Sequence, residues 1–219
     1  MLLRDEKEAE ALSASQTGQA AKPEGAVGRA MGWMMLRING PINARTVEAL
    51  EIGRGETVLE IGCGPGDAVA RLVREGQARR IFAIDHAPEM DRAALKLNRA
   101  AVRDGLVDIR EGSVSSMPFR DGSFDVVFGV NSVQFWPHLR LDLKEVLRVM
   151  KPGGRIVLAM RLTMEPRARR RVEMLLRALP KSGYVEVTEE IADARAFKVA
   201  LISAKRPIFA GGAYDASVA

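Results

Sequence analysis

Residues 58–69 read VLEIGCGPGDAV, and this stretch decides the fold. The apolar run 57–62 leads into three glycines at alternating positions, Gly62, Gly64 and Gly66. A continuous apolar run is typical of a strand that is buried on both faces, as in a parallel sheet. Glycine adopts backbone angles that are closed to other residues, and it lets a ligand approach the main chain. The stretch therefore predicts a buried strand, a ligand-binding turn, and a helix whose free N–H groups point back at the ligand.

Strand-like and helix-like segments alternate along the rest of the chain. Short apolar runs are separated by segments whose apolar residues repeat with the period of a helix, such as 139–150. This alternation predicts βαβ units with right-handed crossovers. The predicted fold class is α/β: a doubly wound, Rossmann-like, mostly parallel seven-stranded sheet with helices on both faces, ending in an antiparallel pair of strands. The predicted strands are 57–62, 80–86, 106–112, 123–131, 155–160, 183–191 and 196–206. A helix that ends at 74 is predicted after the first strand, and further helices are predicted over 88–102, 139–150 and 165–179. A turn is predicted at 152–154.

The chain is expected to form one domain with appendages. A flexible N-terminal arm is predicted over 1–24, which is charged and then rich in small and polar residues. A helical lid is predicted over 25–51, with a break at Asn39-Gly40-Pro41 after which Pro41 opens a second helix. The core domain covers 52–206, and 207–219 is a flexible tail.

Composition excludes several classes of protein. No apolar run reaches the 18 or more residues of a membrane helix. Cys63 is the only cysteine, which excludes a disulfide framework or a thiolate cluster within the chain. No metal and no membrane span are predicted, and the cytoplasm is the expected location. The net charge of +5 is concentrated in 161–171, where five arginines accompany one acidic residue. A solvated helix face is the simplest interpretation, and binding of an anionic partner is the alternative.

Two carboxylates near the glycine turn bear on the kind of cofactor. A dinucleotide site has the pattern G-x-G-x-x-G, but here Asp67 stands where the third glycine of that pattern would be. A carboxylate there repels pyrophosphate, which disfavours NAD or FAD and suits a ligand with a cationic or zwitterionic end. Asp85 ends the second predicted strand, where it can accept hydrogen bonds from the two hydroxyls of a ribose. Capping of the next helix is the alternative role for Asp85.

Four motifs occur in the order and spacing of one protein family. VLEIGCGPG (58–66) resembles the glycine motif of class I S-adenosylmethionine-dependent methyltransferases, and AIDHAPEM (83–90) is similar to their acidic second-strand motif. Residues 112–137 resemble the third and fourth motifs of the small-molecule, type 11-like subgroup, which includes quinone and sterol C-methyltransferases. Residues 145–160 resemble the segment that leads into the fifth strand. The resemblance implies that 52–206 is a methyltransferase domain with S-adenosylmethionine as cofactor and S-adenosylhomocysteine as product.

The resemblance also implies roles for individual residues around the cofactor. Its methionine part would be held by Glu60, by the turn Gly62, Cys63, Gly64 and Gly66, and by Asn131. Its ribose would be held by Asp85, and its adenine would contact His86, Met90, Ser113 and Val114. Because the N-terminal helices of this family close over the cofactor, a lid role is implied for Trp33, Asn39 and Asn43. Packing alone remains the alternative for Cys63.

The implied reaction is in-line displacement of the cofactor's methyl group by an O, N or C nucleophile of a small molecule. The sulfonium is already a leaving group, so the protein must align the nucleophile and exclude water. Gln134, Phe135 and Trp136 are expected to line the acceptor pocket, with core packing as the alternative for the two aromatic residues. His138 is the candidate general base, with substrate contact or a plain helix-start position as alternatives.

Other functions stay open at this stage. The chain lacks the Asn/Asp-Pro-Pro-Tyr/Phe motif of nucleobase and glutamine N-methyltransferases, which argues against nucleic acid as a partner and favours a small-molecule acceptor. One alternative is a non-catalytic subunit that binds S-adenosylmethionine, and another is an RNA methyltransferase that uses the arginines of 161–171. The sequence leaves a homodimer open.

Overall fold

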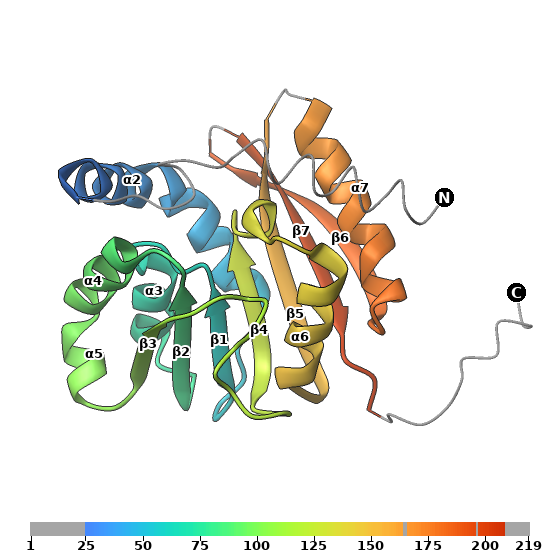
Figure 1. The fold of residues 1–219 in the computed structure, drawn as a ribbon, viewed down its shortest axis with the longest axis horizontal. Helices are drawn as coiled ribbons and strands as arrows, with labels where there is room; N and C mark the ends of the chain where they lie inside the picture. The colour runs from blue at the N-terminus through green and yellow to red at the C-terminus, as the bar shows by residue number, and fades with distance from the viewer. Residues whose placement is uncertain (1–24, 164–165, 196, 209–219) are drawn as a thin grey trace, which may run out of the picture.

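The computed structural model describes residues 25–163, 166–195 and 197–208, apart from the side chains of 25–37 and of residue 166. Its centre is one seven-stranded sheet in the order β3-β2-β1-β4-β5-β7-β6 (Figure 1). The first five strands in that order pair in parallel, whereas β7 runs antiparallel to both of its neighbours. The predicted α/β sheet is therefore confirmed, including its antiparallel final pair. The strands are β1 (Thr57–Ile61), β2 (Arg80–Asp85), β3 (Val107–Glu111), β4 (Phe124–Val130), β5 (Met150–Leu162), β6 (Val185–Ala194) and β7 (Phe197–Lys205).

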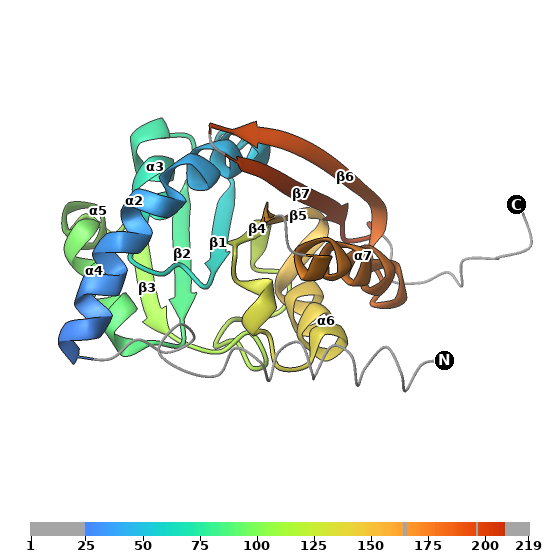
Figure 2. The ribbon, with the colours of Figure 1, turned by 90° about the horizontal axis from the view of Figure 1, so that it is seen from above.

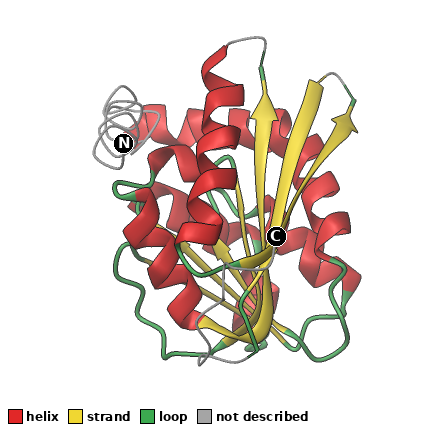
Figure 3. Ribbon diagram, turned by 90° about the vertical axis from the view of Figure 1, so that its right-hand side faces the viewer, coloured by secondary structure: helices red, strands yellow, loops and turns green. Residues whose placement is uncertain are grey.

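Helices cover both faces of the sheet (Figures 2 and 3). Figure 2 shows α2 and α3 on one side of the strands and α6 and α7 on the other. The helices are α2 (Gly25–Leu50), α3 (Asp67–Glu75), α4 (Pro88–Leu97), α5 (Arg99–Arg103), α6 (Leu139–Val149) and α7 (Pro166–Lys181), and η1 (Val133–Phe135) is a short 3-10 turn.

The alternation of side chains along the buried strands produces two separate cores. All five residues of β1 are buried. Val58 belongs to the core shared with α2, α3, α4 and α5, whereas Leu59 and Ile61 belong to the core shared with α6 and α7. Successive side chains of a strand point to opposite faces, so a continuous apolar run can supply both cores at once.

The predicted break at Asn39-Gly40-Pro41 is wrong, because α2 continues through Pro41 to Leu50. Proline removes one intrahelical hydrogen bond, which normally favours a break. Here the following residues Ile42, Val47 and Leu50 are almost fully buried. Packing of this face overrides the local preference of the sequence.

Two further boundaries differ from those expected. The helix expected over 88–102 is divided into α4 and α5 at Asn98, whose Nδ2 donates to the carbonyl oxygens of Gly66 and Ala94. The expected turn at 152–154 lies inside β5, at an irregularity in its pairing with β4. Phe124 of β4 pairs with Met150, whereas Val126 pairs with Arg155. The predicted arm and most of the predicted tail lie outside the described residues.

Candidate functional site

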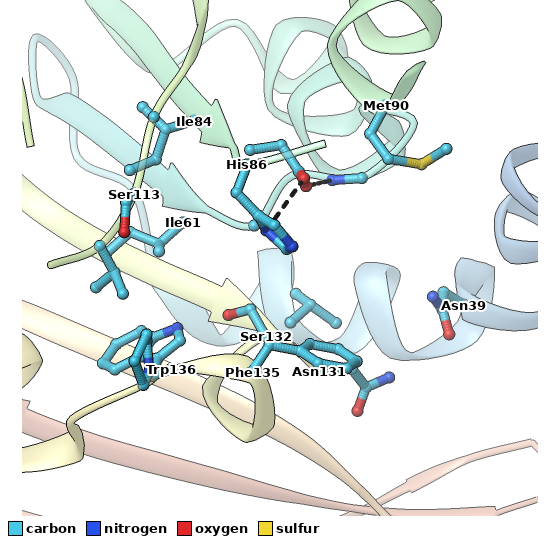
Figure 4. Close-up of a pocket in the computed structure, with 17 residues that line it drawn as sticks. Asn39, Ile61, Ile84, His86, Met90, Ser113, Asn131, Ser132, Phe135 and Trp136 are labelled. Atoms are coloured by element: carbon cyan, nitrogen blue, oxygen red, sulfur yellow. Dashed lines mark hydrogen bonds and ion pairs between the residues drawn. The ribbon is translucent and has the colours of Figure 1, made fainter. Parts of the chain in front are cut away.

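A pocket opens at the carboxyl ends of the central strands (Figure 4). The strand order reverses between β1 and β4, because β2 and β3 lie on one side of β1 and β5 lies beyond β4. Ligands of open α/β sheets bind in the crevice at such a switch point. The pocket is formed by the ends of β1, β2 and β4, the segment after β3, η1, and Asn39 of α2.

Most of the predicted site residues meet in this pocket. The predicted residues that line it are Asn39, Gly62, Gly64, Asp85, His86, Met90, Ser113, Val114, Asn131, Phe135 and Trp136. Six further lining residues were not predicted: Ile61, Ile84, Gly112, Val130, Ser132 and Pro137. Most of these are apolar or lack a side chain, so only their positions at strand ends could have indicated them.

The other predicted residues with described side chains are not in the pocket lining. Gln134 belongs to η1, and the exposed His138 precedes α6. Cys63 is buried, and burial raises the pKa of its thiol well above its ordinary value. Gly66 packs so closely that a Cβ there would lie 2.7 Å from Asn98 Nδ2. The side chain of Trp33 lies outside the described part of the chain.

Asp85 joins the glycine turn to the end of β2. Its Oδ2 accepts a hydrogen bond from the Gly64 N–H at 2.8 Å, and its Oδ1 accepts one from the Ala87 N–H at 3.0 Å. His86 Nδ1 lies 3.7 Å from Asp85 Oδ1. The turn needs glycine because φ is +75° at Gly62 and +52° at Gly64. Each carboxylate oxygen keeps a second lone pair, so Asp85 can still accept from a ligand.

Two further acidic side chains lie buried behind the turn. Burial first, and then the charges of Asp85 and Asp67, raise the pKa of Glu60 well above its ordinary value. Burial first, and then Asp85 and Glu111, raise the pKa of Asp91 to about 7. Glu60 Oε2 and Asp91 Oδ1 have no hydrogen-bond partner among the described residues. This surplus of carboxyl groups favours a ligand that carries positive charge.

Asn43 holds α2 against the helix that follows the turn. Its Nδ2 donates to Asp67 Oδ2 at 2.9 Å, and Arg71 Nε donates to the same oxygen at 2.9 Å. Asp67 is the first residue of α3, so the bond from Asn43 fixes α2 next to the glycine turn. Asn43 therefore positions α2 without lining the pocket, whereas Asn39 of the same helix does line it. The lid role of both residues stays a prediction.

The end of β4 turns sharply into the opposite wall. Asn131 has a φ of +49°, and its Oδ1 accepts from the Arg161 N–H at 2.9 Å. Asparagine tolerates this left-handed conformation better than most residues. The turn leads directly into η1 and so brings Phe135 and Trp136 into the lining. The apolar wall therefore follows from one backbone bend at the carboxyl end of β4.

Asp142 supports this wall from behind, a role that the sequence did not reveal. It is fully buried at the start of α6. Its Oδ1 accepts from Ser115 Oγ at 2.7 Å, and its Oδ2 accepts from the His138 N–H at 2.8 Å. One carboxylate thus ties the segment after β3 to the segment after η1.

A mostly parallel sheet with a glycine turn and the Asp85 carboxylate at its switch point is the arrangement found in proteins that bind nucleoside cofactors. A family model described as a methyltransferase domain matches residues 59–158. The chain is 30% identical over 136 residues to the uncharacterized methyltransferase YdaC of Bacillus subtilis. The matched segment covers 62% of this chain and 71% of that protein. It is 36% identical over 110 residues to the phthiotriol/phenolphthiotriol dimycocerosates methyltransferase of Mycobacterium tuberculosis, covering 50% of this chain and 39% of that protein.

The structure is similar in fold to the [4+2]-cyclase SpnF, with a TM-score of 0.66 and 19% identity, covering 89% of this chain and 86% of that one.

The chain belongs to the class I S-adenosylmethionine-dependent methyltransferases, and S-adenosylmethionine is its cofactor. In the part of the chain that the structure describes, no helix is long and apolar enough to cross a membrane.

Proposed function

We propose that this methyltransferase moves the methyl group of S-adenosylmethionine to an O, N or C nucleophile of a small molecule. The observation that carries the proposal is the pocket itself, in which the glycine turn and the apolar wall of Phe135 and Trp136 line one concave space. Pockets for small molecules are mostly apolar, with a few polar groups that fix orientation. When bound, the cofactor supplies a methyl group on a positively charged sulfur that is a good leaving group.

The residues present fit this cofactor. Asp85 can accept from two ribose hydroxyls through its remaining lone pairs, while it keeps its bonds to the Gly64 and Ala87 amides. The unpartnered Oε2 of Glu60 and the bare backbone at Gly62 suit the cationic methionine part. In this arrangement His86, Met90, Ser113 and Val114 contact the adenine, and Asn131 faces the methionine part.

The apolar wall is proposed to bind the acceptor and exclude water. Among the described residues that line the pocket, the ionisable side chains are Asp85, the last residue of β2, and His86, which follows it. The wall formed by Phe135, Trp136 and Pro137 is therefore suited to an acceptor that is mainly apolar. A low-dielectric wall also strengthens the electrostatic interactions made by the reacting groups.

The RNA alternative is weakened by the contacts of the arginines. Arg161 lies over the ring of Phe197 at 4.1 Å, and Arg169 pairs with Glu189. These two guanidinium groups already have partners within the protein. If RNA were the acceptor, its affinity would fall steeply across a salt series, because phosphate contacts release counterions.

The experiment supplies methyl-labelled S-adenosylmethionine and a cell extract separated into a small-molecule fraction and an RNA fraction, after calorimetry has measured cofactor binding. Label in the small-molecule fraction supports the proposal. Label in RNA supports the alternative, and cofactor binding without transfer to either fraction supports a non-catalytic subunit. Asp85→Ala is the control, because it should lose both binding and transfer.

A further inference from the structure

Ser132 carries an unsatisfied hydroxyl inside the pocket. Its side chain lines the cavity between the glycine turn and η1 (Figure 4), and the residue is 6% exposed. Its Oγ has no hydrogen-bond partner among the described residues. Buried hydroxyl groups are nearly always paired, so an unpaired one at the edge of a binding cavity points to a partner that comes with the ligand.

Two glycines make room for this side chain. A Cβ on Gly62 would lie 2.6 Å from the Cβ of Ser132, and a Cβ on Gly129 would collide with the Ser132 Oγ. Gly129 lies within β4 and is not among the residues with positive φ, so its backbone angles do not demand glycine. Space for the Ser132 hydroxyl is what Gly129 provides. The sheet thus accommodates a hydroxyl that forms no bond within the described protein.

We propose that the Ser132 hydroxyl binds the amino-acid end of S-adenosylmethionine. Ser132 packs on Gly62, at the methionine end of the site, whereas Asp85 and Met90 lie on the ribose and adenine side. A hydroxyl can accept a hydrogen bond from an ammonium group or donate one to a carboxylate, and the cofactor's amino-acid end carries both. The inference rests on the cofactor orientation given under the proposed function.

The test compares two ligands that differ only at this end. S-adenosylhomocysteine has the amino-acid group, whereas 5′-methylthioadenosine keeps the adenosine and the thioether but lacks it. For Ser132→Ala we expect the Kd of S-adenosylhomocysteine to rise about 10-fold or more, as for loss of a hydrogen bond to a charged group. The Kd of 5′-methylthioadenosine should stay within about 2-fold of the wild-type value.

Ser182→Ala is the matched control. Ser182 is also buried and has an unpartnered Oγ among the described residues, but it does not line the pocket. Both ligands should bind this variant as they bind the wild type. An unchanged Kd for S-adenosylhomocysteine in Ser132→Ala, or an equal loss for both ligands, overturns the inference. A wild-type protein that fails to bind S-adenosylhomocysteine overturns the proposed function instead, and the Ser132 inference with it.

The stability of the empty protein separates a ligand role from a structural one. Without ligand, Ser132→Ala should unfold at the same temperature as the wild type or higher, because a methyl group replaces an unpaired buried hydroxyl. A lower unfolding temperature would mean that the hydroxyl supports the fold, which contradicts the inference. Gly129→Ala should reproduce the selective loss for S-adenosylhomocysteine, because its Cβ displaces the Ser132 Oγ.

Discussion

Asp91→Asn should change how the stability of this protein depends on pH. Asp91 is 7% exposed on α4, and its pKa is raised from 3.8 to about 7, first by burial and then by the charges of Asp85 and Glu111. The folded protein therefore holds this proton more tightly than the unfolded chain. The contribution of Asp91 to the free energy of unfolding is fully present below 3.8, its pKa in the unfolded chain. This contribution is lost as the pH rises through the folded-state pKa of about 7.

The size of the effect follows from the two pKa values. A difference of about 3 pKa units corresponds to about 4 kcal/mol in the free energy of unfolding, at 1.36 kcal/mol per unit. About 2.5 kcal/mol of this is lost between pH 5 and pH 8, because part of it is already lost below pH 5. Asparagine does not ionise in this range, so the variant should gain about 2.5 kcal/mol relative to the wild type over the same interval.

Urea unfolding at several pH values between 5 and 8 measures this difference. Other groups with raised pKa, such as Glu60, are present in both proteins and largely cancel. Asp104→Asn, which removes an exposed carboxylate at the end of α5, controls for the loss of one negative charge. Parallel stability curves for wild type and Asp91→Asn would refute the reasoning, because they would show that Asp91 titrates alike in the folded and unfolded states.

Two more predictions concern packing and catalysis. Gly66→Ala should lower the free energy of unfolding by about 3 kcal/mol in urea titrations, because φ is +84° there and a Cβ would lie 3.0 Å from the Cα of Ala94. Gly76→Ala, at φ +67° with open space around it, should cost only about 1–2 kcal/mol, and equal losses would contradict the packing argument. His138→Ala should keep kcat within about threefold of the wild-type value, because the His138 side chain is exposed and does not line the pocket. A fall in kcat of about 10²- to 10⁴-fold would establish His138 as the general base.

The features that the sequence predicted well are those with a local cause. The apolar run before Gly62 predicts a buried strand because both cores require apolar side chains from it. The carboxyl ends of parallel strands meet at one edge, so Asp85 and Asn131 could be assigned to one pocket from their places in the sequence. The assignments of individual contacts to the cofactor remain predictions.

The features that the sequence missed depend on contacts between distant segments. The continuity of α2 through Pro41 depends on the burial of Ile42 and Leu50, which no local pattern near the proline reveals. The unpaired hydroxyl of Ser132 depends on how the end of β4 packs against Gly62, 70 positions earlier in the chain. A serine after a strand is ordinary in sequence, and only the packing shows that nothing within the described protein satisfies it.

The departure from the dinucleotide pattern also has a structural explanation beyond repulsion of pyrophosphate. Asp67 stands where that pattern has its third glycine, and its carboxylate receives hydrogen bonds from Asn43 of α2 and from Arg71 of α3. A glycine there could not hold α2 beside the turn. The close approach between helices is provided instead by Gly66, which packs against Asn98 and Ala94. Because the third glycine stands at position 66 and not 67, the side chain of Asp67 can bind Asn43 of α2, the helix that also carries Asn39 to the pocket. The altered glycine spacing therefore connects the glycine turn to α2.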